Sequence, residues 1–240
     1  MRWLRPRRRS LASSAGGGGV ENVHVVRNGA DLSVVEEAPP HPDEEQRELR
    51  CVYMGNVGRS QGLDMVVRAA AELQRRGVAI SVRIMGHGAH VRELAELAAS
   101  LQAPVRVSTR IEHSLVRLQY EWADSVIVSL RDWGPFEWTI PSKLYEVLAT
   151  GRHITGVLSG EAAALVRDNA AGDVVPPGDL EALVQLWERL AADRGLCRQP
   201  SRGREWVARH ADDPGLIARY LEILEDVRRT RDAPERAHTH

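Results

Sequence analysis

The sequence predicts an α/β fold in which a parallel sheet carries helices on both faces. Short runs rich in β-branched residues alternate with stretches of helical period from about residue 21 to about residue 230. Such alternation is typical of parallel strands joined by crossover helices. Of the 240 residues, 43% are hydrophobic, which is enough for a full core. The alternation contains no internal repeat.

The expected strands are runs in which Val, Ile and other apolar residues cluster between turn residues. They are VHVV at 23–26, CVYM at 51–54, VAISVRIM at 78–85, VRVS at 105–108, SVIVSL at 125–130, HITGVL at 153–158 and DVVP at 173–176. The expected helices are stretches in which apolar residues recur every three or four positions. They cover 63–76, 91–101, 114–122, 141–150, 161–167, 180–193 and 215–229.

Composition divides the chain into a central domain and two ends. Residues 1–20 are basic and end in a run of glycines, so we expect a flexible lead-in. One domain is expected over residues 21–212, followed by a terminal helix over 213–232 and a disordered tail over 233–240. The apolar residues of the terminal helix lie on one side, which packs either on its own domain or on another one.

The helix expected after residue 140 carries the only lysine among 32 basic residues, Lys143. Pro141 suits a first helical position, which places Lys143 in the first turn. There the helix dipole disfavours a cation by ~0.3–1 kcal/mol and favours an anion. Ser142 adds a hydroxyl donor, so this helix start has the groups that hold phosphate. The alternative is an ion pair between Lys143 and Glu146 on a solvated face.

The loop GNVGRSQGLD at 55–64 leaves an expected strand at the carboxyl edge of the sheet, where such folds bind ligands. Its glycines permit close backbone approach. Asn56, Arg59 and Gln61 offer donors to phosphate oxygens. The alternative is a flexible turn with an exposed arginine.

Two further loops follow expected strands. GHGAH at 86–90 fails as a dinucleotide fingerprint, because it lacks the third glycine and a correctly placed acidic residue. We therefore expect His87 and His90 to be loop and helix-start residues rather than metal ligands. RDWGPFEW at 131–138 gathers aromatic side chains that would wall a sugar or a base, or pack against another protein surface.

Charge and cysteine content exclude several classes of protein. The formal net charge is −1, and neither the basic start nor the acidic run at 43–48 indicates a nucleic-acid surface. No stretch approaches the roughly 18 apolar residues of a membrane span, and the start lacks the apolar region of a signal peptide. We therefore expect a soluble, cytoplasmic protein. Cys51 and Cys197 are expected to be buried small hydrophobes. The sequence contains no cluster of acidic ligands, so we expect no metal site.

Six segments occur in an order that is specific as a set. They are NGAD at 28–31, YMGNVGRSQGLD at 53–64, IMGHGA at 84–89, ADSVIVSL at 123–130, PSKLYEVLATG at 141–151 and GDVVPPGDLEAL at 172–183. Through them the chain resembles the carboxyl-terminal, donor-binding domain of family-4 retaining glycosyltransferases of the GT-B architecture, in the glycosyltransferase family 1 group. The forms of the motifs are most similar to those of enzymes that add sugars to lipid-linked carriers in capsule, colanic-acid or O-antigen assembly. The resemblance implies a Rossmann-like sheet, one half of a GT-B fold.

The resemblance also implies roles for individual residues toward a nucleotide-sugar donor, for which we expect a UDP-sugar. Glu146 matches the second glutamate of the E-x(7)-E motif and would bind the ribose hydroxyls. The diphosphate would be held by Ser142, Lys143 and the Leu144 amide together with Asn56, Arg59 and Gln61. The base would contact the backbone of Thr109, Arg110 and Ile111.

The chain departs from the family pattern at two places. Asn56 and Gln61 replace the basic pair usual in the first loop. The leading glutamate of E-x(7)-E, which contacts the sugar in the family, falls on Trp138. The sequence therefore does not predict which sugar is bound. Glu137, beside Trp138, is the one candidate catalytic residue. Glu161 is expected to begin a helix rather than to act as acid or base.

The resemblance implies an acceptor-binding amino-terminal domain that has no counterpart in the sequence. We therefore expect either a separate acceptor-domain polypeptide or a truncated reading of a longer gene, and no transfer by the chain alone. The expected partners are the donor and a glycan or lipid-linked acceptor, which leaves peripheral binding at the inner face of the membrane open. No cofactor is expected, because the nucleotide-sugar is a substrate. The alternatives are a non-catalytic nucleotide-binding or relic module and, more weakly, a nucleotide-sugar epimerase.

Overall fold

The computed structural model describes residues 24, 26, 28–38, 48–109 and 113–232. Within these residues the strands form one six-stranded parallel sheet with the order β3-β2-β1-β4-β5-β6. The strands are β1 (Leu49–Met54), β2 (Ile80–Met85), β3 (Val105–Ser108), β4 (Ser125–Ser129), β5 (His153–Val157) and β6 (Gly172–Val175). The chain reverses its direction of winding between β1 and β4, which creates a crevice at their carboxyl ends.

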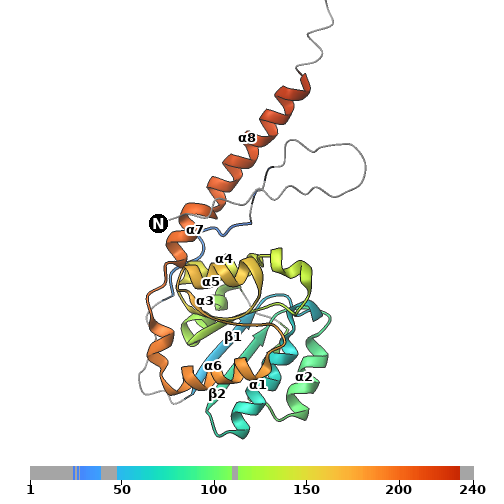
Figure 1. Ribbon diagram of the computed structural model, residues 1–240, viewed down its shortest axis with the longest axis vertical. Coiled ribbons are helices and arrows are strands. Elements are labelled where there is room, and N and C mark those ends of the chain that lie inside the picture. Colours follow the sequence, from blue (N-terminus) through green and yellow to red (C-terminus); the bar gives the residue numbers. More distant parts are fainter. Residues whose placement is uncertain (1–23, 25, 27, 39–47, 110–112, 233–240) are drawn as a thin grey trace, which may run out of the picture.

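Helices cover both faces of the sheet, as Figure 1 shows. One face packs on α1 (Leu63–Arg75), α2 (Val91–Ser100) and α6 (Leu180–Ala192). The other packs on α3 (His113–Trp122), α4 (Ser142–Thr150), α5 (Gly160–Asp168) and α7 (Gly203–His210). The central strand β1 serves both cores, because Cys51 and Tyr53 face the first and Val52 and Met54 the second. The predicted α/β fold is confirmed.

The strand expected at 23–26 is wrong for the residues that can be described. His24 and Val26 lie in no strand, and positions 23 and 25 are outside the described residues. Further along the chain, Ala30 forms an isolated parallel bridge with Asp212, which follows α7. An apolar run joins a sheet only if a neighbouring strand accepts its hydrogen bonds, and here the chain reaches helix ends instead.

Several short elements were not expected from the sequence. They are α7 and the 3₁₀ helices η1 (Arg59–Gln61), η2 (Gly134–Trp138) and η3 (Arg194–Arg198). The terminal helix α8 runs over Asp213–Asp232 and extends away from the body (Figure 1). No helix among the described residues combines the length and the apolarity needed to cross a membrane.

The two glycine-rich loops at the carboxyl edge of the sheet meet backbone to backbone. Gly55 N–H donates to the carbonyl of Met85 at 3.0 Å, and Val57 N–H donates to the carbonyl of His87 at 2.6 Å. A Cβ at Gly86 would lie 1.8 Å from the Gly55 carbonyl oxygen, so only glycine fits. The loop at 86–90 therefore seats the loop after β1, on one side of the crevice.

Candidate functional site

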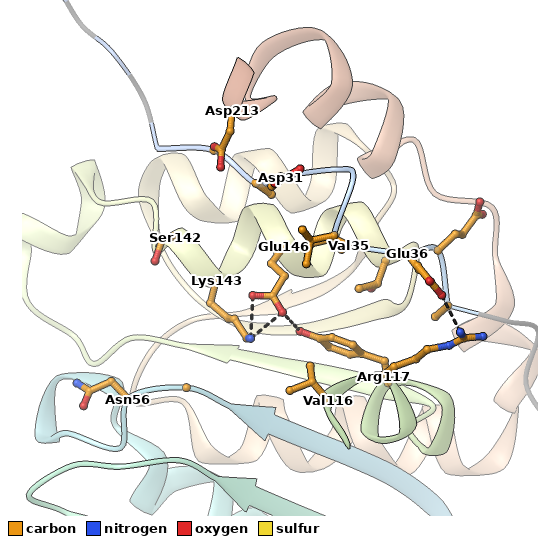
Figure 2. A pocket seen from close by; sticks show the side chains of 18 residues that line it. Asp31, Val35, Glu36, Asn56, Val116, Arg117, Ser142, Lys143, Glu146 and Asp213 are labelled. Carbon is orange, nitrogen blue, oxygen red and sulfur yellow. Dashed lines mark hydrogen bonds and ion pairs between the residues drawn. The ribbon is translucent and has the colours of Figure 1, made fainter. Parts of the chain in front are cut away.

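A cavity of about 640 Å³ opens beside the crevice between β1 and β4. Its size lies within the range of small-molecule sites, ~300–1,000 Å³. Five parts of the chain supply its walls: the segment 29–38, the loop after β1, helix α3, helix α4 and Asp213 at the start of α8 (Figure 2). The lining residues include Asp31, Glu36, Gly55, Asn56, Val116, Arg117, Tyr120, Ser142, Lys143, Glu146 and Asp213.

The first turn of α4 forms one wall. Pro141 has an extended backbone, with φ −60° and ψ 134°, so it caps the helix from outside and Ser142 is the first helical residue. Pro141 was expected at the first helical position, whereas it is the N-cap residue just before the helix. The N–H groups of a first turn have no intrahelical acceptor. The Leu144 N–H, however, donates to the Pro141 carbonyl at 2.9 Å, so a phosphate oxygen would have to share it.

Lys143 and Glu146 lie side by side in the cavity (Figure 2). The Lys143 ammonium donates to both carboxylate oxygens of Glu146, at 2.8 and 2.9 Å. Each side chain is 30% exposed. The ion pair considered from the sequence is therefore present, but it lines a cavity rather than a solvated face.

Tyr120, on α3, completes this group. Its hydroxyl donates to Oε1 of Glu146 at 2.8 Å, while the side chain as a whole is buried. Burial, and then the negative charge of Glu146, raises the pKa of Tyr120, so the hydroxyl stays a donor. Sequence reasoning missed Tyr120, because its contact with Glu146 joins two helices that are 26 positions apart.

The loop after β1 contributes Asn56 but not the other two expected residues. Asn56 is exposed and lines the cavity opposite Ser142 and Lys143 (Figure 2). Arg59 points elsewhere and pairs with Glu93 at 2.9 Å. The Gln61 side chain accepts a hydrogen bond from Gly58 N–H at 3.0 Å, which closes its own turn. Arg59 and Gln61 are not among the residues that line the cavity.

The expected base contacts are described only in part. Thr109 is exposed just after β3, whereas Arg110 and Ile111 lie outside the described residues. Ser108 Oγ, on the residue before Thr109, and His90 Nδ1 are buried without a hydrogen-bond partner among the described residues. His90 precedes α2, as expected, and its Nε2 lies 3.0 Å from Glu93. The described residues bring together no group of three metal-ligating side chains.

The aromatic loop lies apart from the cavity. Trp133 and Trp138 are 57% and 67% exposed, and Glu137 is exposed and does not line the cavity. The Glu137 backbone packs on Gly160, where a Cβ would lie 2.0 Å from the Glu137 carbonyl oxygen. Glu161 follows in the first turn of α5, as expected. The structure therefore places no carboxylate of this loop against Lys143 and Glu146.

Comparisons with known proteins agree with this fold. The family model for glycosyl transferases group 1 matches residues 48–193. Sucrose-phosphate synthase from Thermosynechococcus elongatus superposes with a TM-score of 0.66 at 19% identity, over 86% of this chain and 53% of that one. HepE from Anabaena, solved with UDP and glucose, gives 0.67 at 16% identity, over 85% and 57%.

A third solved structure is itself a single domain. The C-terminal domain of the glycosyl transferase group 1 protein LpcC from Francisella tularensis gives a TM-score of 0.56 at 16% identity, over 77% of this chain and 100% of that one. The chain spans about half the length of the synthase and of HepE. A comparison with curated protein sequences gives no significant match. The family match covers more than half of the chain, and the sheet has the architecture of a GT-B domain. The chain therefore belongs to the glycosyl transferases group 1 family.

Proposed function

We propose that this chain is the donor-binding domain of a glycosyltransferase that uses a nucleotide-diphospho-sugar, a UDP-sugar in the first instance, for hexosyl transfer. One observation carries the proposal: Lys143 and Glu146 stand together in a cavity at the switch point of the sheet. A cation at a helix start suits a diphosphate, and a carboxylate one turn further on suits the hydroxyls of a ribose. HepE, which shares the fold, was solved with UDP and glucose, and this supports the choice of nucleotide.

We assign the diphosphate to Lys143, Ser142 and the first-turn N–H groups of α4, with Asn56 on the opposite wall. Arg59 joins them only if it leaves Glu93, because the two side chains are paired at 2.9 Å. The base falls beyond Thr109, toward residues that are not described. For the acceptor we keep a lipid-linked or polysaccharide chain. The enzyme that this implies is cytoplasmic, with its acceptor near the inner face of a membrane.

The acceptor-binding part is proposed to lie in another domain or in a separate polypeptide. Glycosyl transfer requires that donor and acceptor be held together away from water. Helix α8 is an argument for a second domain or protein, because it projects from the domain (Figure 1) and its apolar side chains are between 49% and 60% exposed. These side chains are Ile217, Tyr220, Leu221, Leu224 and Val227. A contiguous apolar face of this kind marks a contact surface.

One observation favours a second candidate function, nucleotide binding without catalysis. Trp138 occupies the place where the resemblance puts a sugar-contacting glutamate, and its side chain is 67% exposed. Glu137 lies outside the cavity. A domain that holds a nucleotide but lacks this carboxylate would serve as a regulatory or relic module. Transfer of a labelled sugar, in the presence of the acceptor-binding partner, separates the two functions.

Calorimetric titration tests the site itself. UDP, UDP-sugars and GDP-sugars are titrated into the wild-type chain, Lys143→Ala and Glu146→Ala. The matched controls are Arg92→Ala and Glu96→Ala, which break an exposed ion pair on α2 outside the cavity. We expect UDP to bind the wild type and both controls, and to bind Lys143→Ala and Glu146→Ala about tenfold more weakly, since hydrogen bonds to charged groups contribute ~1.5–3 kcal/mol. Equal binding by all five proteins, or no binding of any nucleotide, contradicts the proposal.

A further inference from the structure

The Glu146 carboxylate has little acceptor capacity left for a ribose. A carboxylate offers about four lone-pair sites, two on each oxygen. Oε1 accepts from Lys143 at 2.8 Å and from Tyr120 at 2.8 Å, and Oε2 accepts from Lys143 at 2.9 Å. No other contact of this carboxylate is found among the described residues, so one site on Oε2 remains. The two hydroxyls of a ribose diol need two sites, so they cannot both bind Glu146 while Lys143 keeps both of its contacts.

Lys143 is the contact that is free to leave. Its side chain is 30% exposed and ends on four flexible carbons, so the ammonium can swing toward the helix start. The pair is partly open to solvent, and solvent-exposed pairs contribute only ~0.2–1 kcal/mol, less than a charge-assisted contact to a diphosphate. A diphosphate at the start of α4 would thus bind the Lys143 ammonium more strongly than Glu146 does.

Tyr120 is the contact that stays. Its side chain is 5% exposed and packs in the core under α4, so its hydroxyl has a fixed position. Figure 2 shows the phenol reaching Glu146 from the side opposite to Lys143. When Lys143 moves away, the tyrosine hydroxyl still holds Oε1 and leaves the other acceptor sites directed into the cavity.

We propose that the donor binds by an exchange at Glu146, in which the diphosphate draws Lys143 away and the ribose diol takes the acceptor sites that it frees. Tyr120 is the positioning residue that keeps the carboxylate in place during the exchange. This inference rests on the proposed function, since it assumes a ribose at Glu146. It adds that the two halves of the site are coupled: the phosphate half must be filled before the ribose half binds at full strength.

The coupling predicts that one substitution changes the affinity for uridine and the affinity for UDP in opposite directions. Lys143→Met removes the charge and keeps the length of the side chain. Uridine, which has no phosphate, should bind this variant about 1.5- to 5-fold more tightly than it binds the wild type, the factor that corresponds to the lost ion pair. UDP should bind it about tenfold more weakly. NMR titration measures both affinities, with 2′-deoxyuridine as the control, because without the diol the gain should vanish.

Tyr120→Phe tests the positioning role in the Lys143→Met background. We expect uridine to bind the double variant about 3-fold more weakly than Lys143→Met alone, since the carboxylate loses its one fixed partner. Weaker or unchanged uridine binding by Lys143→Met overturns the exchange, and so does an equal gain for 2′-deoxyuridine. Tighter uridine binding after Tyr120→Phe overturns the positioning role. If Glu146→Ala binds UDP like the wild type, the proposed function fails first. If Glu146→Ala weakens UDP but Lys143→Met leaves uridine unchanged, only this inference fails.

Discussion

The replacement Gly86→Ala tests whether the backbone contact between the two glycine loops builds the crevice. Gly86 has a φ of +149°, which L side chains rarely adopt, and a Cβ there would lie 1.8 Å from the carbonyl oxygen of Gly55. The obstacle is backbone rather than a flexible side chain. An alanine therefore fits only if the loop after β1 moves away, together with the Asn56 wall of the cavity.

The magnitude follows from two costs. An unfavourable backbone conformation of this kind costs about 1–3 kcal/mol. Moving the loop also weakens the hydrogen bonds from Gly55 N–H to Met85 and from Val57 N–H to His87, at 3.0 and 2.6 Å, each contributing about 1 kcal/mol. We expect Gly86→Ala to lower the free energy of unfolding by about 3–5 kcal/mol. That is a large share of the ~5–15 kcal/mol typical of a domain.

Urea unfolding followed by the fluorescence of the six tryptophans measures this loss. Two other glycines are matched controls, because a Cβ at either would meet nothing within 4 Å. Gly77→Ala carries only the strain of a positive φ, +77°, for which we expect about 1–2 kcal/mol. Gly134→Ala should stay within about 0.5 kcal/mol of the wild type. If Gly86→Ala loses no more than Gly77→Ala, the loops do not meet as closely as the structure shows, and the reasoning is refuted.

Three further predictions concern a tryptophan of the core, the partly exposed carboxylate of Asp173 and the terminal helix. Trp187→Ala should lower the free energy of unfolding by about 3–5 kcal/mol, because the side chain is fully buried and its Nε1–H donates to Thr155. Trp133→Ala, at an exposed position, should change it by less than about 0.5 kcal/mol in the same urea assay. The hydrogen bond with His153 lowers the pKa of Asp173. Stability that Asp173 contributes is therefore present above about pH 4 and is lost as the pH falls through the folded-state pKa. Asp173→Asn should flatten the fall of the urea midpoint between about pH 5 and pH 3, and an unchanged slope contradicts this. Leu224→Glu, on the exposed face of α8, should leave the urea midpoint unchanged and reduce any concentration-dependent association seen by sedimentation.

Most of the fold could be predicted from the sequence, because local patterns determine most of its strands and helices. Buried parallel strands are runs of β-branched residues, and amphipathic helices repeat every three or four positions, so six of the seven expected strands are found. The pattern fails where local sequence does not decide. Three of the four residues at 23–26 are valines, yet His24 and Val26 lie in no strand. Helix α7 buries only Gly203 and Val207, so its sequence shows no apolar stripe of helical period.

The residues of the candidate site were likewise predicted where local sequence determines the contact, and missed where it does not. Lys143 and Glu146 were found because both lie in one short helix, where a spacing of three residues fixes their meeting. Tyr120 was missed because its partner is 26 positions away, and no local pattern reports such a contact. Arg59 and Gln61 have the right chemistry in the right loop, but they turn to Glu93 and Gly58. Residue type predicts what a side chain can bind, whereas packing decides where it points.

The charge of the cavity sets how the site must work if it binds a diphosphate. Among the residues that the structure describes, five carboxylates line it, against two basic residues, Lys143 and Arg117. Arg117 is held by Glu36 at 2.8 Å and by Glu121 at 2.8 Å. Lys143 is therefore the one basic group of the lining whose carboxylate partner is itself a proposed donor contact. Attraction by net positive charge cannot gather the donor here, so binding has to depend on directed contacts: the ammonium of Lys143, the N–H groups of the α4 start and the amide of Asn56. Such contacts depend on geometry, which is why the close packing of the loop after β1 on Gly86 and the hydrogen bond from Tyr120 to Glu146 matter to this site.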